Sequence, residues 1–221
     1  DKDGNQVELA KISRGANRIP VSIDRIPQHV RDAFVYIEDE RFYEHAGVDW
    51  KRTFGAFLNE LTHGMLYGSK QGGSTITQQL VKNVTGDKEQ NMDRKMREIF
   101  RAADLEKYRT KDEILDAYLN CVGMGGSCSG VQAAALKYFG KDVSELDLAE
   151  AACLAAIPKS PESLNPFANK EANRERQLLV LKAMYNNAAI SKQQYDDAVN
   201  EELQFRDPNS ETNSSEIQNW Y

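Results

Sequence analysis

Helical periodicity, interrupted only by turns, constrains the fold of this chain most. Val30, Phe34 and Ile37 recur at i, i+4 and i+7, the spacing of one face of an α-helix. Thr110 and Glu113 have the spacing of a capping box, which marks the start of another helix. We find no internal repeat and no alternating strand pattern longer than a few residues. The sequence therefore predicts a mainly α fold.

Turn and cap residues divide the chain into expected helices. Pro27 suits a first helical turn, Ser74 is the expected N-cap of a later helix, and Gly140 is an expected C-cap. Two further capping pairs are Ser144 with Asp147 and Ser191 with Gln194. The expected helices cover about 25–38, 48–62, 75–84, 92–103, 113–120, 131–139, 144–156, 170–187 and 191–203. Within 92–103, the expected apolar face consists of Met92, Met96, Ile99, Phe100 and Ala103.

Composition excludes several classes of protein. The formal net charge of -6 argues against nucleic-acid binding, which usually needs a broad basic face. The longest apolar run, Ala151 to Ile157, is far shorter than the roughly 18 residues that span a bilayer. None of the three histidines has zinc-like spacing with one of the three cysteines, so a structural metal site is not expected.

Two glutamates lie in segments whose residues suit chemistry on a phosphate-activated sugar. Glu38 opens EDERFYEHAG, and Glu98 closes RKMRE. Between them lies GGSTITQQLVKN (72–83), in which Gln79, Lys82 and Asn83 share one helix face. A carboxylate can remove a proton from a sugar hydroxyl, and nearby cations can hold a phosphate leaving group. This arrangement suggests sugar transfer.

Plainer interpretations exist for the same residues. Arg94 and Glu98 at i, i+4 could form an ordinary surface ion pair. Glu38 could belong to a charged helix end, and His45 could be a hydrogen-bonded structural histidine. The segment 72–83 is harder to explain as a surface helix, because adjacent glutamines and a Lys-Asn pair suit the wall of a polar site better.

Five segments in this order and spacing resemble the motifs of the family 51 peptidoglycan glycosyltransferases. They are EDERFYEHAG, GGSTITQQLVKN, RKMRE, KDEILDAYLN and IPKSPESLNP, and the resemblance runs from about Ile19 to Phe205. It implies a lysozyme-like fold over 21–205, with a large globular lobe and a smaller, membrane-facing jaw lobe within about 50–95. It also implies transfer between two lipid II-type substrates, with inversion and release of undecaprenyl pyrophosphate.

The resemblance also implies roles for single residues. Glu38 matches the catalytic base, and Glu98 matches a second catalytic position that orients the neighbouring cations or a divalent ion such as Mg²⁺. No cofactor is otherwise required. The matching substrate-binding positions are Asp39, His45, Ser74, Thr75, Gln79, Lys82, Asn83, Arg94, Lys95 and Lys159.

The ends of the chain suggest its setting. Residues 1–20 are expected to form an extended lead-in, and 206–221 resemble the linker that precedes a transpeptidase domain in bifunctional members of the family. No SxxK nucleophile motif of such a domain is present. We expect the extracytoplasmic face of the bacterial cytoplasmic membrane, with an anchor outside this chain.

The loop after YLN departs from the family pattern, because it reads CVGMGGSCSG. Cys121 and Cys128 could close this short loop as a disulfide, which suits an extracytoplasmic enzyme. The alternative is a pair of buried free thiols. Both remain open from the sequence.

The stretch between Trp50 and Tyr67 is rich in apolar residues, which predicts contact with the membrane surface. The alternative is that these apolar residues all belong to the core. The expected partners are lipid II, the growing glycan strand, moenomycin-type inhibitors and other cell-wall synthesis proteins. A lytic hydrolase would not need the cations Lys82, Arg94 and Lys95, and a scaffold module would tolerate loss of Glu38. Both rivals are therefore less favoured.

Overall fold

The structure is a computed structural model that describes residues 18–53, 55, 73–86 and 92–207. The helices in these ranges are η1 (Ile23–Arg25), α1 (Gln28–Glu38), α3 (Ile76–Thr85), α4 (Met92–Leu105), α5 (Lys111–Cys121), α6 (Val131–Phe139), η2 (Val143–Glu145), α7 (Leu148–Ala156), η3 (Ile157–Lys159), α8 (Lys170–Asn186) and α9 (Lys192–Asn200). Pairing of extended backbone in the described residues amounts to one bridge, Gly123 with Ser129. The predicted mainly α fold is confirmed.

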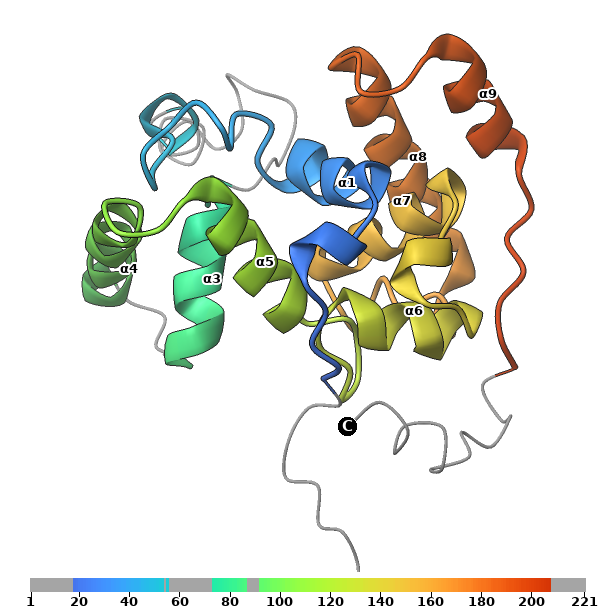
Figure 1. The fold of residues 1–221 in the computed structure, drawn as a ribbon, viewed down its shortest axis with the longest axis horizontal. Coiled ribbons are helices and arrows are strands. Elements are labelled where there is room, and N and C mark those ends of the chain that lie inside the picture. The colour runs from blue at the N-terminus through green and yellow to red at the C-terminus, as the bar shows by residue number, and fades with distance from the viewer. Residues whose placement is uncertain (1–17, 54, 56–72, 87–91, 208–221) are drawn as a thin grey trace, which may run out of the picture.

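The helices form two groups around one core (Figure 1). In the first group, α7 packs against both α1 and α8, and α9 packs against α8. Residues 149–156 of α7 are buried on every side, because their small side chains let neighbouring helices approach closely. In the second group, α3 packs against α4 and α5. Glu38, at the end of α1, leads from the first group towards the second.

Most helix starts follow local capping chemistry. The predicted capping boxes at Thr110 and Ser191 are confirmed. The N-cap of α3 is Thr75 and not the predicted Ser74, because the Thr75 side chain accepts from the backbone N–H of Gln78 while Gln78 caps in return. The predicted start of α7 at Ser144 is also wrong, because its cap is Asp147.

The outer side of α4 differs from the prediction. Met92, Met96 and Phe100 are 73%, 52% and 66% exposed, so the expected apolar face does not pack inside the described part of the protein. The buried residues of α4 are Glu98 and Ala102. The side of the helix that faces α3 therefore carries a charged group, which needs partners there.

Three regions of the sequence prediction fall on residues that lie outside the described ones. These are most of the expected helix over 48–62 with the rest of the apolar stretch to Tyr67, most of the lead-in over 1–20, and 208–221 of the linker. The jaw lobe and the domain boundaries therefore stay predictions. In the described ranges, no helix combines the length and apolar character needed to cross a bilayer.

Candidate active site

Glu38 ends α1 with its carboxylate in a largely buried position. The residue is 9% exposed, and its Oε2 accepts a hydrogen bond of 2.8 Å from Gln79 Nε2 on α3. Its other oxygen, Oε1, is buried and has no hydrogen-bond partner in the described part of the chain. One oxygen is therefore anchored, and the other keeps its lone pairs for an incoming group.

A tyrosine behind Gln79 fixes the orientation of its amide. The Tyr118 hydroxyl donates to Gln79 Oε1 at 3.3 Å, which leaves the amide nitrogen directed at Glu38. Tyr118 is fully buried, and burial, followed by the negative charge of Glu38, raises the pKa of its phenol well above the ordinary value. Tyr118 therefore stays a neutral hydrogen-bond donor.

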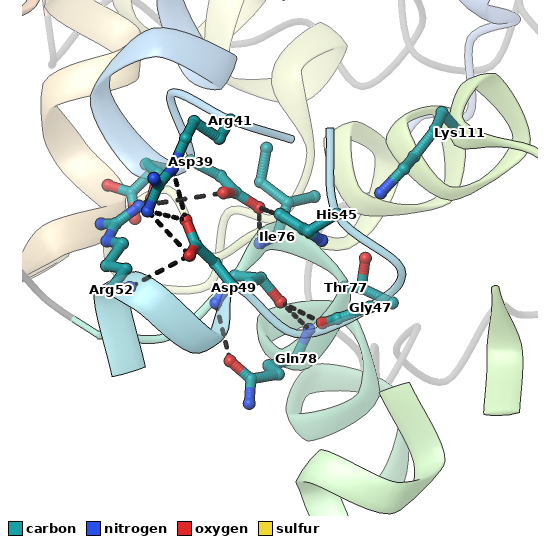
Figure 2. A network of polar contacts seen from close by, with 12 residues as sticks. Asp39, Arg41, His45, Gly47, Asp49, Arg52, Ile76, Thr77, Gln78 and Lys111 are labelled. Atoms are coloured by element: carbon teal, nitrogen blue, oxygen red, sulfur yellow. Dashed lines mark hydrogen bonds and ion pairs between the residues drawn. The ribbon is translucent and has the colours of Figure 1, made fainter. Parts of the chain in front are cut away.

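Asp39 holds the loop after α1 against the start of α3 (Figure 2). Its carboxylate is fully buried, and Oδ2 accepts from His45 Nε2 at 2.9 Å and from the backbone N–H of Ile76 at 3.0 Å. The Arg52 guanidinium lies 3.9 Å from Oδ1 and donates to the Glu38 backbone carbonyl at 2.6 Å. An anion at a helix N-terminus is stabilised by the free N–H groups there. Asp39 and His45 are thus positioned to shape the site.

A second acid in the same loop binds two arginines (Figure 2). Asp49 accepts from Arg41 Nε at 2.9 Å, from Arg41 Nη2 at 2.8 Å and from the Arg52 backbone at 3.0 Å. Burial alone would raise the pKa of Asp49, but the hydrogen bonds from Arg52 and Arg41 outweigh burial and lower it. This bidentate pair fixes the loop that carries His45.

Gly47 brings this loop against the N-cap of α3 and the backbone of α4. Thr75 Oγ1 donates to the Gly47 carbonyl at 2.7 Å. Gly47 has φ +83°, and a Cβ atom there would lie 2.4 Å from the Ala102 carbonyl oxygen of α4. Only glycine fits such an approach without displacing α4.

Lys111 supports the same region from α5. Thr77 Oγ1 donates to Glu106 Oε1 at 2.5 Å, and Lys111 Nζ lies 2.7 Å from Glu106 Oε2. The Lys111 ammonium also stands 4.5 Å from the centre of the Phe42 ring. Charge–ring and charge–charge contacts therefore connect the start of α5 to α3 and to the Glu38 loop.

Glu98 gathers two cations on α4. Arg94 Nη1 donates to Glu98 Oε2 at 2.6 Å, and Lys95 Nζ bonds to Glu98 Oε1. Lys95 also donates to Ser74 Oγ at 2.8 Å, which ties α4 to the residue before α3. Glu98 is 5% exposed, so the simple surface ion pair considered for Arg94 and Glu98 is not what the structure contains.

These contacts do not suit a divalent ion at Glu98. Both of its oxygens face cations, which would repel Mg²⁺. In the described ranges, no three or more His, Cys, Asp or Glu residues gather in a metal-holding arrangement.

Three of the predicted substrate-binding residues lie on the surface. Lys82 and Asn83 are exposed near the end of α3, and Lys159 is exposed at the end of η3. The structure brings together Glu38, Asp39, His45, Thr75 and Gln79 in one network, and Ser74, Arg94, Lys95 and Glu98 in a second.

The site also contains residues that the sequence did not single out. Arg52 and Asp49 come from the segment predicted as an amphipathic helix, and Tyr118 comes from the fourth motif. Arg176 reaches Glu38 from α8, with Nη2 at 3.8 Å from Oε1. Sequence spacing contains no signal for a contact between such distant segments.

Of the two alternatives for Cys121 and Cys128, the structure contains free thiols, with Cys128 buried and Cys121 partly exposed. The Met124 N–H donates to the Cys128 carbonyl, and the Gly130 N–H donates to the Val122 carbonyl, so Cys128 lies opposite Met124. Cys121 is three positions further along this register, at the end of α5. Disulfides need facing Cβ atoms and Cα atoms within about 7 Å, and this stagger works against both.

Comparisons with known proteins identify the family of this chain. The family model described as Transglycosylase matches residues 5–185. Penicillin-binding protein 1A of Clostridium perfringens is 43% identical over 91% of this chain and 30% of that protein. The same-named protein of Aquifex aeolicus is 44% identical over 87% of this chain and 26% of its own length, and penicillin-binding protein 1F of Bacillus subtilis is 42% identical over 86% and 26%.

A solved structure gives the same fold. The crystal structure of penicillin-binding protein 1A from Haemophilus influenzae aligns with a TM-score of 0.53 and 25% identity, over 91% of this chain and 20% of that one. The chain thus spans less than a third of the length of these relatives. It belongs to the transglycosylase family, the peptidoglycan glycosyltransferases of bacterial cell-wall synthesis.

Proposed function

We propose that this domain polymerises lipid II into β-1,4-linked glycan strands and that Glu38 is its general base. The 4-hydroxyl of the acceptor sugar gives its proton to Glu38, and its oxygen forms a bond to the anomeric carbon of the donor. The bond from that carbon to the pyrophosphate breaks, and undecaprenyl pyrophosphate leaves with the bonding electrons. Attack opposite the leaving group inverts the configuration.

One observation carries this proposal. Glu38 is buried, its Oε2 is held by Gln79 at 2.8 Å, and its Oε1 has no hydrogen-bond partner in the described part of the chain. A buried carboxylate oxygen without a partner costs free energy unless a ligand completes it. A sugar hydroxyl supplies the missing donor and, in the same contact, the proton to be removed.

The cations of α3 and α4 support transfer over hydrolysis. Lys82 is exposed on α3, and Arg94 and Lys95 project from the adjacent helix. We assign them to the pyrophosphate, whose negative charge grows as it leaves. Glu98 holds Arg94 and Lys95 in place until substrate binds. A hydrolase acting on the finished glycan has no leaving pyrophosphate for such a set to stabilise.

The test is incubation of the domain with lipid II, followed by gel separation of the products. We expect a ladder of glycan polymers with wild type and about 10²–10⁴-fold slower polymerisation with Glu38→Gln, whose amide cannot act as a base. Asp24→Asn, a change on the exposed η1 turn, serves as the matched control. A Glu38→Gln rate above about a tenth of wild type, or short hydrolysis products in place of polymer, would refute the proposal.

The membrane surface is the second part of the proposal. The substrate's lipid stays in the bilayer while its sugars react, so the site must lie at that surface. The apolar stretch between Trp50 and Tyr67 is our candidate for the contact, and most of it lies outside the described residues. In liposome flotation, Phe57→Ser combined with Leu61→Ser should reduce binding. Unchanged liposome binding by the folded double variant would show that this stretch is not the membrane contact.

A further inference from the structure

Arg176 and Glu38 face each other without a direct hydrogen bond. Arg176 lies on α8, which packs across α1, and its Nη2 is 3.8 Å from Glu38 Oε1. Hydrogen bonds of this type are about 2.7–3.2 Å long, so the two groups are too far apart to bond. Their side chains are 21% and 11% exposed, which leaves limited access to water.

Each of these two side chains has one buried polar atom without a hydrogen-bond partner in the part of the chain that the structure describes. Glu38 Oε1 and Arg176 Nε are each buried without a hydrogen-bond partner among the described residues. Native proteins rarely leave such atoms unpaired unless a water or ligand completes them. An oxygen atom about 2.7 Å from a carboxylate and about 2.9 Å from a guanidinium nitrogen would bridge a gap of this width.

Among the described residues, the other polar groups around Glu38 do not hydrogen-bond to Oε1. Arg52 donates to the Glu38 backbone carbonyl at 2.6 Å and lies beside Asp39, so it does not contact the Glu38 carboxylate by these bonds. Gln79 occupies Oε2 and is backed by the neutral Tyr118. Within the described ranges, Arg176 is therefore the cation that faces Oε1.

We propose that Arg176 is a catalytic residue that binds the attacking hydroxyl together with Glu38. This inference rests on the proposed function. The hydroxyl donates its proton to Glu38 Oε1 and accepts a hydrogen bond from Arg176 Nη2. As the proton moves to Glu38, negative charge develops on the hydroxyl oxygen, and the guanidinium stabilises it at short range. Arg176 keeps all its protons, and the oxygen's electron pair forms the new glycosidic bond.

This role differs from that of the cations on α3 and α4. Those groups are assigned to the leaving pyrophosphate, whereas Arg176 acts on the nucleophile. Arg176 also reduces the freedom of the hydroxyl, because two fixed contacts define the direction of its remaining lone pair. Orientation of this kind contributes to the rate separately from proton removal.

The test compares Arg176→Gln and Arg176→Lys in steady-state kinetics with lipid II. We expect Arg176→Gln to lower kcat about 10²-fold, the usual effect of removing one such donor, with a much smaller change in KM. The kcat of Arg176→Lys should lie between those of wild type and Arg176→Gln, because lysine keeps the positive charge but lacks the planar guanidinium. Lys182→Gln, an exposed cation on the same helix, should match wild type.

A double-mutant cycle separates this role from a purely structural one. In Glu38→Gln, where no base removes the proton, adding Arg176→Gln should slow residual polymerisation less than about three-fold, because groups acting as a unit are non-additive. Full additivity, or an Arg176→Gln kcat within about three-fold of wild type, would overturn the inference. If Arg176→Gln does not fold, Arg176→Lys decides, and wild-type kcat in that variant refutes the role. An inactive wild type, or an active Glu38→Gln, would instead refute the proposed function.

Discussion

Gln79 donates from Nε2 to Glu38 Oε2 at 2.8 Å and so links the end of α1 to α3. The amide can hold this direction because Tyr118 occupies its oxygen at 3.3 Å. The carboxylate that we propose as the base is thus oriented by two neutral groups, Gln79 and Tyr118.

Tyr118→Phe should slow polymerisation by about two- to ten-fold, the equivalent of one neutral hydrogen bond, because the Gln79 amide loses the contact that orients it. Tyr138→Phe is the matched control, since its buried hydroxyl donates to the Met124 carbonyl at 2.6 Å. Both variants should lose similar stability in urea unfolding. Equal polymerisation rates in the two variants would contradict the orienting role of Tyr118.

Lys82→Ala and Lys95→Ala should each weaken binding of a moenomycin-type phosphoglycolipid by about ten-fold or more, as expected for loss of one charge-assisted contact. Fluorescence anisotropy with a labelled inhibitor measures this effect. Lys95→Ala should also reduce stability, because Lys95 bonds to Ser74 and to buried Glu98, whereas Lys82 is exposed. Lys107→Ala, an exposed control on the surface, should bind normally. Unchanged binding in both test variants would place the phosphate site elsewhere.

Asp49 should make the stability of the domain sensitive to acid. Its folded-state pKa is lowered, so it stabilises the fold above the ordinary carboxyl pKa of about 3.9 and loses this contribution as the pH falls through the folded-state value. In urea unfolding, Asp49→Asn should therefore be less stable than wild type at pH 7, and the difference should shrink by pH 3. A difference that stays constant over that interval would contradict the assignment.

The three cysteines should resist alkylation in the folded protein. Burial raises the pKa of all three thiols, that of Cys128 to about 11, so little thiolate exists at pH 8. Cys121, which is partly exposed, should react first, and all three should react in urea. Mass spectrometry of unreduced tryptic peptides checks the pairing. A linked Cys121–Cys128 peptide from protein prepared without reductant would contradict the free thiols.

Local chemistry was readable from the sequence, and long-range contacts were not. The capping boxes at Thr110 and Ser191 depend on residues three positions apart, so the sequence predicts them correctly. The cap of α3 is one residue off because Ser74 and Thr75 are both good caps, and the tertiary bond from Thr75 to Gly47 favours the second. The resemblance to known motifs singled out Glu38 and Glu98 as candidates, together with their partners Gln79, Arg94 and Lys95, but it did not single out Tyr118 or Arg176.

The errors have physical causes of the same kind. The predicted apolar face of α4 points outward at Met92, Met96 and Phe100, because periodicity shows that a helix has an apolar face and not what covers that face. Glu98 is buried on the opposite side of α4, because Arg94 and Lys95 neutralise its charge. Arg176 could not be found at all, because its relation to Glu38 arises from the packing of α8 on α1.

The close approach at Gly47 has a consequence for how this site can vary. Because its α-carbon lies against the backbone of Ala102, the separation between the Glu38 loop and α4 is set by main-chain atoms and not by side chains. Side-chain substitutions around the site can change its charge or its hydrogen bonds without altering that spacing. Gly47→Ala, in contrast, would push α4 away from this loop. The cations of α4 would then move relative to Glu38, although the substitution changes no polar side chain of the site.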